Sequence, residues 1–327
     1  MDGITFIMNK PKISIILSTY NSSDTLSKTI DSVLSQSFTD FELIIINDAS
    51  IDSTNEILKK YYKKDYRIIV ISNDSNLGLT KNLNKGIKKA KGKYIARIDN
   101  GDWWQDINKL KEQVNFLEKN KDYILCGTQV KYIDNKNNVL GVSNFSITDR
   151  KIREHLLIGQ GIFSHPTIMF RNKILYRDFF QYSQDLDLYI RLSFIGKLYC
   201  FKKYSVICRI DENGLTMKKK YYQRQYQNIA YSFFIERLKY KEDALDKNIM
   251  PKIRENKIEL FLFNISIKFF IKYAKEKTLQ KNIFLWLLPL IISFIFYPPL
   301  FIDYIKKIKR LLFIKIYNKK YKKYFNI

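Results

Sequence analysis

Four short polar clusters in this chain could carry chemistry, and each directly follows a predicted β-strand. They are Ser18-Thr19-Tyr20-Asn21, Asn47-Asp48-Ala49-Ser50, Asn76-Leu77-Gly78 and Asp99-Asn100-Gly101-Asp102. A single cluster of this kind is commonly a helix cap or an Asx turn. In an open α/β sheet, however, ligands bind beyond the carboxyl ends of the strands. Four clusters at one edge therefore favour a binding site.

The residue types indicate a nucleoside diphosphate rather than a dinucleotide as the ligand. Neither GxGxxG nor GxxxxGK[ST] accompanies the clusters, which disfavours a dinucleotide fold or a P-loop. Tyr20 and Asp48 could hold a base and its ribose. A divalent cation, Mn²⁺ or Mg²⁺, on Asp99 and Asp102 could bridge a diphosphate, because such cations prefer oxygen ligands.

Strands that alternate with helices must position these clusters. Apolar, β-branched runs predict strands at 12–18, 41–46, 67–72 and 93–98, and helices are expected after the first three, the third near 79–90. This alternation is typical of an α/β fold with a doubly wound, mostly parallel sheet. The continuous apolar strands indicate burial on both faces.

After Asp102 the alternation weakens, yet no Gly/Pro/Ser linker marks a domain boundary. The pattern predicts helices near 106–119 and 184–195 and strands around 123–133 and 166–171. We therefore expect one catalytic domain at 10–215, with a donor half at 10–103 and an acceptor half at 104–215. Residues 216–327 form a predicted helical C-terminal region.

Several separated motifs occur in a familiar order. They are ISIILSTYNSSDTLSKTIDSVLSQSFTDFELIIINDASIDST (13–54), NLGLTKNLNKGI (76–87), GKYIARIDNGD (92–102), FSHPTIMFR (163–171) and SQDLDLYIRLS (183–193). Together they resemble the inverting glycosyltransferases of family 2, which have the GT-A fold, over residues 10–215. The resemblance implies a nucleotide-sugar donor, a divalent metal and inversion at the anomeric carbon.

The resemblance also assigns roles in donor binding. Ser18 and Tyr20 would lie beside the nucleobase, with Tyr20 stacked on it. Asp48 matches the acidic residue that accepts a hydrogen bond from the pyrimidine N3–H, which favours a UDP- or dTDP-sugar. Asp99 matches the first position of the family's Asp-x-Asp-Asp metal motif.

The metal motif departs from the family pattern. The usual metal-binding position is Gly101, so Asp102, one residue on, is the natural substitute ligand. A metal held mostly by diphosphate and water would tolerate one weak protein ligand. In the family, a histidine near His165 can contact diphosphate or metal, and a satisfied structural histidine is the alternative.

Inverting transfer needs a carboxylate that deprotonates the acceptor hydroxyl as it attacks. The family uses a Glu-Asp pair at a helix start, and here the pair is Gln184-Asp185. Asp185 is therefore the predicted base, although a carboxylate there could merely favour the helix dipole. Asp187 is expected to be structural, with support from Arg191 one turn away.

Three further side chains have open roles. Trp103 and Trp104 could stack on a sugar face or pack in the core. Arg171 could pair with a phosphate, as could Arg191.

The C-terminal region suggests a membrane surface. Lys and Arg outnumber Asp and Glu by 57 to 32, a net charge of +25, and basic residues flank the uncharged segment 284–302. Its length would just span a bilayer, but its prolines and two basic flanks favour an interfacial or re-entrant segment on anionic lipid. A buried helical hairpin is the alternative.

These observations predict a metal-dependent hexosyltransferase at the cytoplasmic side of the cell membrane. It would extend a lipid-linked saccharide acceptor in capsule, lipopolysaccharide or other surface polysaccharide synthesis. A nucleotidyltransferase would need a glycine-rich basic loop after the first strand, where STYNSSD stands. A nucleic-acid-binding protein would need a basic stripe on a recognisable module, so nucleic acid is not an expected partner.

Overall fold

A computed structural model of the protein describes residues 10–157, 161–171, 174–210, 219–253 and 262. The chain divides into two units. The first comprises Met1–His155 and Gly161–Gly214, and the second comprises Leu156–Gln160 and Leu215–Ile327.

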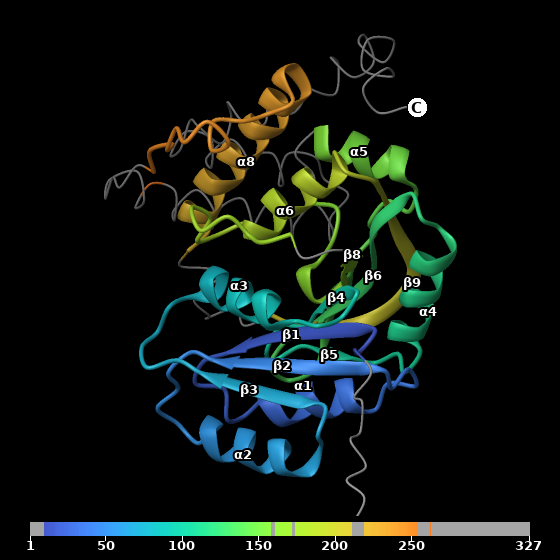
Figure 1. Ribbon diagram of the computed structural model, residues 1–327, viewed down its shortest axis with the longest axis vertical. Coiled ribbons are helices and arrows are strands. Elements are labelled where there is room, and N and C mark those ends of the chain that lie inside the picture. Colours follow the sequence, from blue (N-terminus) through green and yellow to red (C-terminus); the bar gives the residue numbers. More distant parts are fainter. Residues whose placement is uncertain (1–9, 158–160, 172–173, 211–218, 254–261, 263–327) are drawn as a thin grey trace, which may run out of the picture. The chain divides into compact units, whose positions relative to one another are not determined.

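Four parallel strands form the half of the sheet that carries the predicted polar clusters (Figure 1). They are β1 (Ile13–Thr19), β2 (Phe41–Asn47), β3 (Ile68–Ser72) and β4 (Tyr94–Arg97), in the order β3-β2-β1-β4. Helices α1 (Leu26–Leu34), α2 (Thr54–Lys64) and α3 (Leu79–Lys89) connect them. The expected α/β alternation is confirmed here. Because parallel strands end at the same edge, the four clusters share that edge.

Beyond β4 the sheet becomes mixed rather than mostly parallel. The short strand β8 (Met169–Arg171) is antiparallel to β4 and to β6 (Tyr123–Ile133), whereas β9 (Lys197–Arg209) runs parallel to β6. The remaining elements are β5 (Trp103–Trp104), β7 (Val139–Val142), α4 (Lys109–Lys119), α5 (Asp149–Leu157), the 3-10 turn η1 (His165–Thr167) and α6 (Gln184–Ser193). The antiparallel pairing of β5 with β9 brings the residues after Asp102 beside the end of β9.

Helix α3 packs unusually close to the sheet because Gly86 has no side chain. A Cβ there would lie 2.7 Å from Ile16 Cγ2 and 2.9 Å from Ile46 Cδ1, both in buried strands. Close packing also buries Asn82 one turn earlier. The helix thereby presents a polar side chain to the carboxyl edge of β1.

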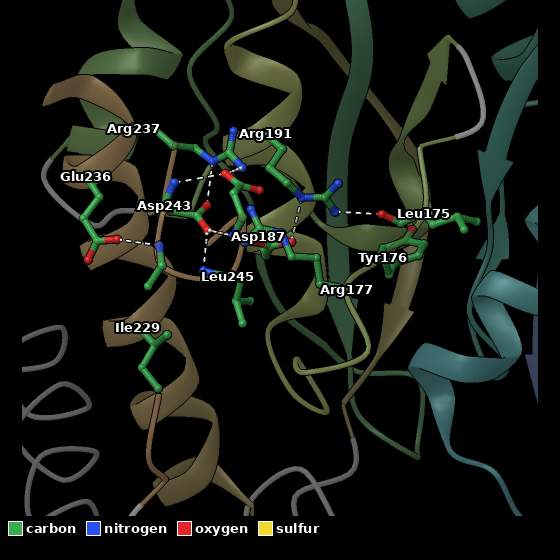
Figure 2. A network of polar contacts seen from close by, with 12 residues as sticks. Leu175, Tyr176, Arg177, Asp187, Arg191, Ile229, Glu236, Arg237, Asp243 and Leu245 are labelled. Atoms are coloured by element: carbon green, nitrogen blue, oxygen red, sulfur yellow. Dashed lines mark hydrogen bonds and ion pairs between the residues drawn. The ribbon is translucent and has the colours of Figure 1, made fainter. Parts of the chain in front are cut away.

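The second unit contains helix α8 (Lys220–Tyr240). Arg237 near its end pairs with Asp243 through Nε at 2.6 Å and also with Asp246 (Figure 2). Among the described residues, no helix combines the length and hydropathy needed to cross a bilayer. The predicted apolar segment 284–302 lies outside the described residues.

Lys109 is a cationic residue whose side chain lies in the core of the first unit. Lys109, at the start of α4, has no exposed surface, and its Nζ donates to Gln113 Oε1 at 2.9 Å and lies 4.1 Å from the centre of the Trp104 ring. Burial lowers the pKa of Lys109 from 10.5 to about 7. The folded state therefore disfavours the charged form, because an ammonium without a carboxylate partner is poorly solvated there.

This lysine should make stability depend on pH. Between the folded pKa of about 7 and the unfolded value of 10.5, the unfolded chain binds more protons. The free energy of unfolding should therefore rise with pH there, by up to about 1.4 kcal/mol per pH unit. Urea unfolding of wild type and Lys109→Met isolates this contribution, because the methionine cannot titrate. Parallel pH curves for the two proteins would contradict it.

Candidate active site

Asp48 lies at the carboxyl end of β2, where backbone amides hold its side chain. Its Oδ1 accepts from Asn73 Nδ2 and from the Leu77 N–H, both at 2.8 Å, and its Oδ2 accepts from the Gly78 N–H at 3.0 Å. Burial alone would raise the pKa of Asp48, but these hydrogen bonds outweigh it and lower the pKa. The lowered pKa favours the ionised carboxylate, which is a stronger acceptor for a base N–H than the protonated acid.

A relay of side-chain amides joins Asp48 to Ser18, another predicted donor-binding residue. Asn73 Nδ2 also donates to Asn82 Oδ1 at 2.7 Å, and Asn82 Nδ2 donates to Ser18 Oγ at 3.2 Å. Lys85 Nζ donates to Asn73 Oδ1 at 2.7 Å. The sequence patterns did not single out Asn73, Asn82 and Lys85. Asn82 could have been found, because it is an asparagine on the apolar face of the helix predicted near 79–90.

Arg97, at the end of β4, has no exposed surface and fixes the metal motif. Its guanidinium contacts the Ile16 carbonyl and Asp99 Oδ1, and its Nε donates to His165 Nε2 at 3.3 Å. Asp99 keeps a side-chain exposure of 33%. One oxygen of Asp99 is thus committed to the buried cation while the side chain still reaches solvent.

The contacts of His165 define its protonation state. Its Nε2 lies 2.7 Å from Tyr176 Oη as well as within reach of Arg97 Nε, which always donates. Nε2 is therefore the acceptor and the proton is on Nδ1, which lies 3.9 Å from Asp99 Oδ2. Burial, with the Arg97 charge, lowers the pKa of His165 to about 3, so the ring is neutral.

Asp102 points toward β9 rather than into solvent. Its Oδ1 accepts from the Arg209 backbone N–H at 3.0 Å, and burial together with the Asp99 charge raises its pKa to about 8. Among the described residues, no group of three or more His, Cys, Asp or Glu side chains is placed to hold a metal ion. The role of Asp102 as a metal ligand stays a prediction, and it would require this carboxyl group to turn.

Asp185 occupies the first turn of α6 and interacts electrostatically with Asp99 and Arg97. Burial and the negative charge of Asp99 raise the pKa of Asp185 to about 6. Asp187, by contrast, accepts from Arg191 Nε at 2.9 Å, and Arg191 also donates to the Leu175 carbonyl (Figure 2). The prediction that Asp187 is structural and supported by Arg191 is confirmed.

Four buried polar side-chain atoms of the described residues have no hydrogen-bond partner. They are Thr19 Oγ1, Asn100 Oδ1, Tyr189 Oη and Arg209 Nε. Leaving a buried donor or acceptor unpaired is costly. Thr19 ends β1, Asn100 lies in the metal motif, Tyr189 follows Asp185 by one turn of α6, and Arg209 ends β9. Two of these residues adjoin the predicted metal ligands: Asn100 follows Asp99 in the chain, and the Arg209 backbone N–H donates to Asp102.

The structure distinguishes the two adjacent tryptophans and gives Arg171 contacts within the fold. Trp104 is buried and donates to the Pro166 carbonyl at 3.1 Å, whereas Trp103 is half-buried. Arg171 donates to the Tyr123 and Asn120 carbonyls at 2.7 and 3.1 Å, so its guanidinium is used within the fold and the phosphate contact suggested for it is wrong.

The architecture is that of a GT-A glycosyltransferase: a curled mixed sheet flanked by helices, with polar clusters at the carboxyl ends of its parallel strands. Among solved structures, S. aureus TarS 1–349 in complex with UDP-GlcNAc has a TM-score of 0.55 at 18% identity, over 79% of this chain and 80% of that one. The family model for glycosyl transferase family 2 matches residues 14–180. The chain belongs to this family, which confirms the resemblance.

Sequence relatives agree with this assignment. An uncharacterized glycosyltransferase of Methanocaldococcus jannaschii is 35% identical over 196 residues, or 56% of this chain and 65% of the relative. The UDP-Glc:alpha-D-GlcNAc-diphosphoundecaprenol beta-1,3-glucosyltransferase WfaP of Escherichia coli is 41% identical over 109 residues, or 33% of this chain and 42% of the relative. The chain thus spans less than two thirds of the length of both relatives.

The protonation state of His165 can be tested with two amides. Asn at this position puts an amide near the place of Nδ1, and Gln puts one near Nε2. If the Nδ1–H oriented toward Asp99 is what matters, His165→Asn should keep about tenfold more kcat/KM for the donor than His165→Gln, the usual effect of a hydrogen bond to a charged group. Higher activity in His165→Gln would instead assign the contact to Nε2.

Proposed function

We propose that the protein is an inverting glycosyltransferase that moves a hexose from a UDP- or dTDP-sugar to a hydroxyl of a lipid-linked saccharide. The observation that carries this proposal is that Asp185, whose raised pKa suits a general base, lies within the electrostatic influence of Asp99, which reaches solvent. The product would belong to a surface polysaccharide. The name of WfaP gives a UDP-glucose donor and a diphosphoundecaprenol-linked acceptor, which supports this substrate class.

Donor recognition would use the carboxyl edge of β1 and β2. Asp48 is a fixed, ionised acceptor suited to the N3–H of uracil or thymine. Tyr20, which is 48% exposed, is available to stack on the base. Ser18 would lie beside the base, held by the relay through Asn82.

In the transfer step, the acceptor oxygen attacks the anomeric carbon while Asp185 takes its proton. The bond from that carbon to the donor diphosphate breaks, and its electron pair leaves with the diphosphate. Attack opposite the leaving group inverts the anomeric centre. The pKa of about 6 keeps Asp185 ionised at neutral pH yet basic enough to accept the proton.

The diphosphate leaves with negative charge that must be neutralised. Mn²⁺ or Mg²⁺, when bound, would supply Lewis-acid stabilisation of this charge. Asp99 is the described carboxylate best placed to hold such an ion together with the diphosphate, because Gly101 offers no ligand and Asp102 faces β9. His165 would orient Asp99 rather than bind the ion, since its Nε2 is engaged by Arg97 and Tyr176.

We propose that the enzyme works at the cytoplasmic side of the cell membrane, against an anionic lipid surface. The support is the excess of 57 Lys and Arg over 32 Asp and Glu, with basic residues flanking 284–302. Cationic residues near anionic lipid are attracted by up to about 1 kcal/mol each. Nucleotide sugars and lipid-linked acceptors would meet there.

The function is tested by incubating purified protein with UDP- and dTDP-hexoses and a polyprenyl-diphosphate-linked sugar, and measuring transfer. Asp185→Asn should lower kcat by about two to four orders of magnitude with donor affinity nearly unchanged. In wild type, kcat should fall as the pH drops below the pKa of about 6, because the base becomes protonated. Asp187→Asn is not a suitable control, since it breaks an ion pair. No transfer with any donor, or full activity in Asp185→Asn, would reject the proposal.

The metal is tested by removing it. Chelator should abolish transfer, and Mn²⁺ or Mg²⁺ should restore it with weak apparent affinity, because the protein supplies few ligands. Asp99→Asn should raise the metal concentration for half activity by about tenfold, the effect of losing a charge-assisted contact. Full activity in chelator would mean that side chains alone neutralise the diphosphate.

A further inference from the structure

Two cations lie against one tryptophan beside the metal motif. Lys28 Nζ, from α1, is 3.3 Å from the centre of the Trp103 ring, and Arg209 Cζ, at the end of β9, is 5.8 Å from it. The Arg209 charge, after burial, lowers the pKa of Lys28. Cation–π contact offsets only part of the repulsion between two such charges.

No carboxylate of the described residues forms an ion pair with either cation. Asp102 accepts from the backbone N–H of Arg209, not from its guanidinium. Arg209 Nε is buried without a hydrogen-bond partner. A guanidinium donor left unpaired next to a second cation is the arrangement expected where an anion binds.

Lys28 and Arg209 contact Trp103, which follows Gly101 by two residues, and Gly101 is the position where the family's second metal carboxylate is missing. Helix α1 holds the motif through Thr25 Oγ1, which accepts from Asn100 Nδ2 at 3.0 Å, and Thr29 Oγ1, which accepts from the Gly101 N–H at 3.2 Å. A Cβ on Gly101 would meet only Thr25 Oγ1, at 4.0 Å. Open space therefore adjoins the helix that carries Lys28.

We propose that Lys28, Trp103 and Arg209 form a subsite for a substrate diphosphate group. The inference rests on the proposed transfer from a nucleotide sugar to a lipid-linked acceptor, both of which carry this group. Arg209 offers a planar fork for phosphate oxygens and Lys28 a point charge. The two cations would add to the neutralisation supplied by a metal ion on Asp99, since Gly101 brings no carboxylate to the site.

The subsite is tested by calorimetric titration of the full chain with two probes, UDP and farnesyl diphosphate, which represent the donor and the acceptor. Lys28→Met and Arg209→Met should each weaken at least one probe by about 5- to 50-fold, as expected for charge-assisted contacts. The probe that weakens identifies the source of the diphosphate. Lys28→Arg and Arg209→Lys, which keep the charge, should recover part of the affinity.

Lys63→Met is the matched control, because it removes one exposed positive charge from α2. It should bind both probes within about twofold of wild type, since distant surface charges are screened. Wild-type protein that binds neither probe, or a folded Lys28→Met that binds both like wild type, would overturn the subsite. If Arg209→Met fails to fold, the exposed Lys28 decides the question. If wild type transfers sugar normally and the variants bind both probes as wild type does, the subsite alone is rejected. If wild type binds the probes but transfers no sugar, the proposed function is rejected.

Discussion

A guanidinium buried at the end of β4 constrains the site more than any other described group. The charge of Arg97 has no exposed surface, and an unpaired charge there would be strongly destabilising. Its partners come from three places: the Ile16 carbonyl of β1, Asp99 of the metal motif and His165 of η1. Satisfying one cation therefore links β1, β4 and the turn η1 within the acceptor half.

The charge of Arg97 also acts on the protonation of Asp185 and His165. The Arg97 charge opposes the rise in pKa that burial and Asp99 impose on Asp185, and burial together with the Arg97 charge lowers the pKa of His165. Asp48, surrounded by amide donors, has a lowered pKa, whereas Asp102, buried near Asp99, has a pKa of about 8. Environment thus gives three carboxyl groups of the same chemistry a lowered pKa (Asp48), a pKa of about 6 (Asp185) and a pKa of about 8 (Asp102).

Features that depend on residues close together in the sequence could be predicted, whereas contacts between distant residues could not. The strands 12–18, 41–46 and 123–133 were predictable because long apolar runs encode them locally, and the clusters at their ends followed from strand polarity. Strand β9 was missed because Lys202 and Lys203 interrupt its apolar pattern. The pairing of Arg97 with His165, 68 residues apart, and the relay through Asn73 and Asn82 depend on tertiary packing, for which one sequence gives no periodic signal.

Gly101 departs from the family's metal motif in its backbone conformation as well as in its missing carboxylate. Gly101 has φ +87°, a conformation that residues with a Cβ rarely adopt. An aspartate there would strain the turn, so the loop is built for glycine. In this turn the next residue, Asp102, is directed toward the Arg209 N–H. The negative charge available to a metal is therefore reduced on one side of the site. Lys28 and Arg209, which both lie against the Trp103 ring, bring positive charge to the same part of the site.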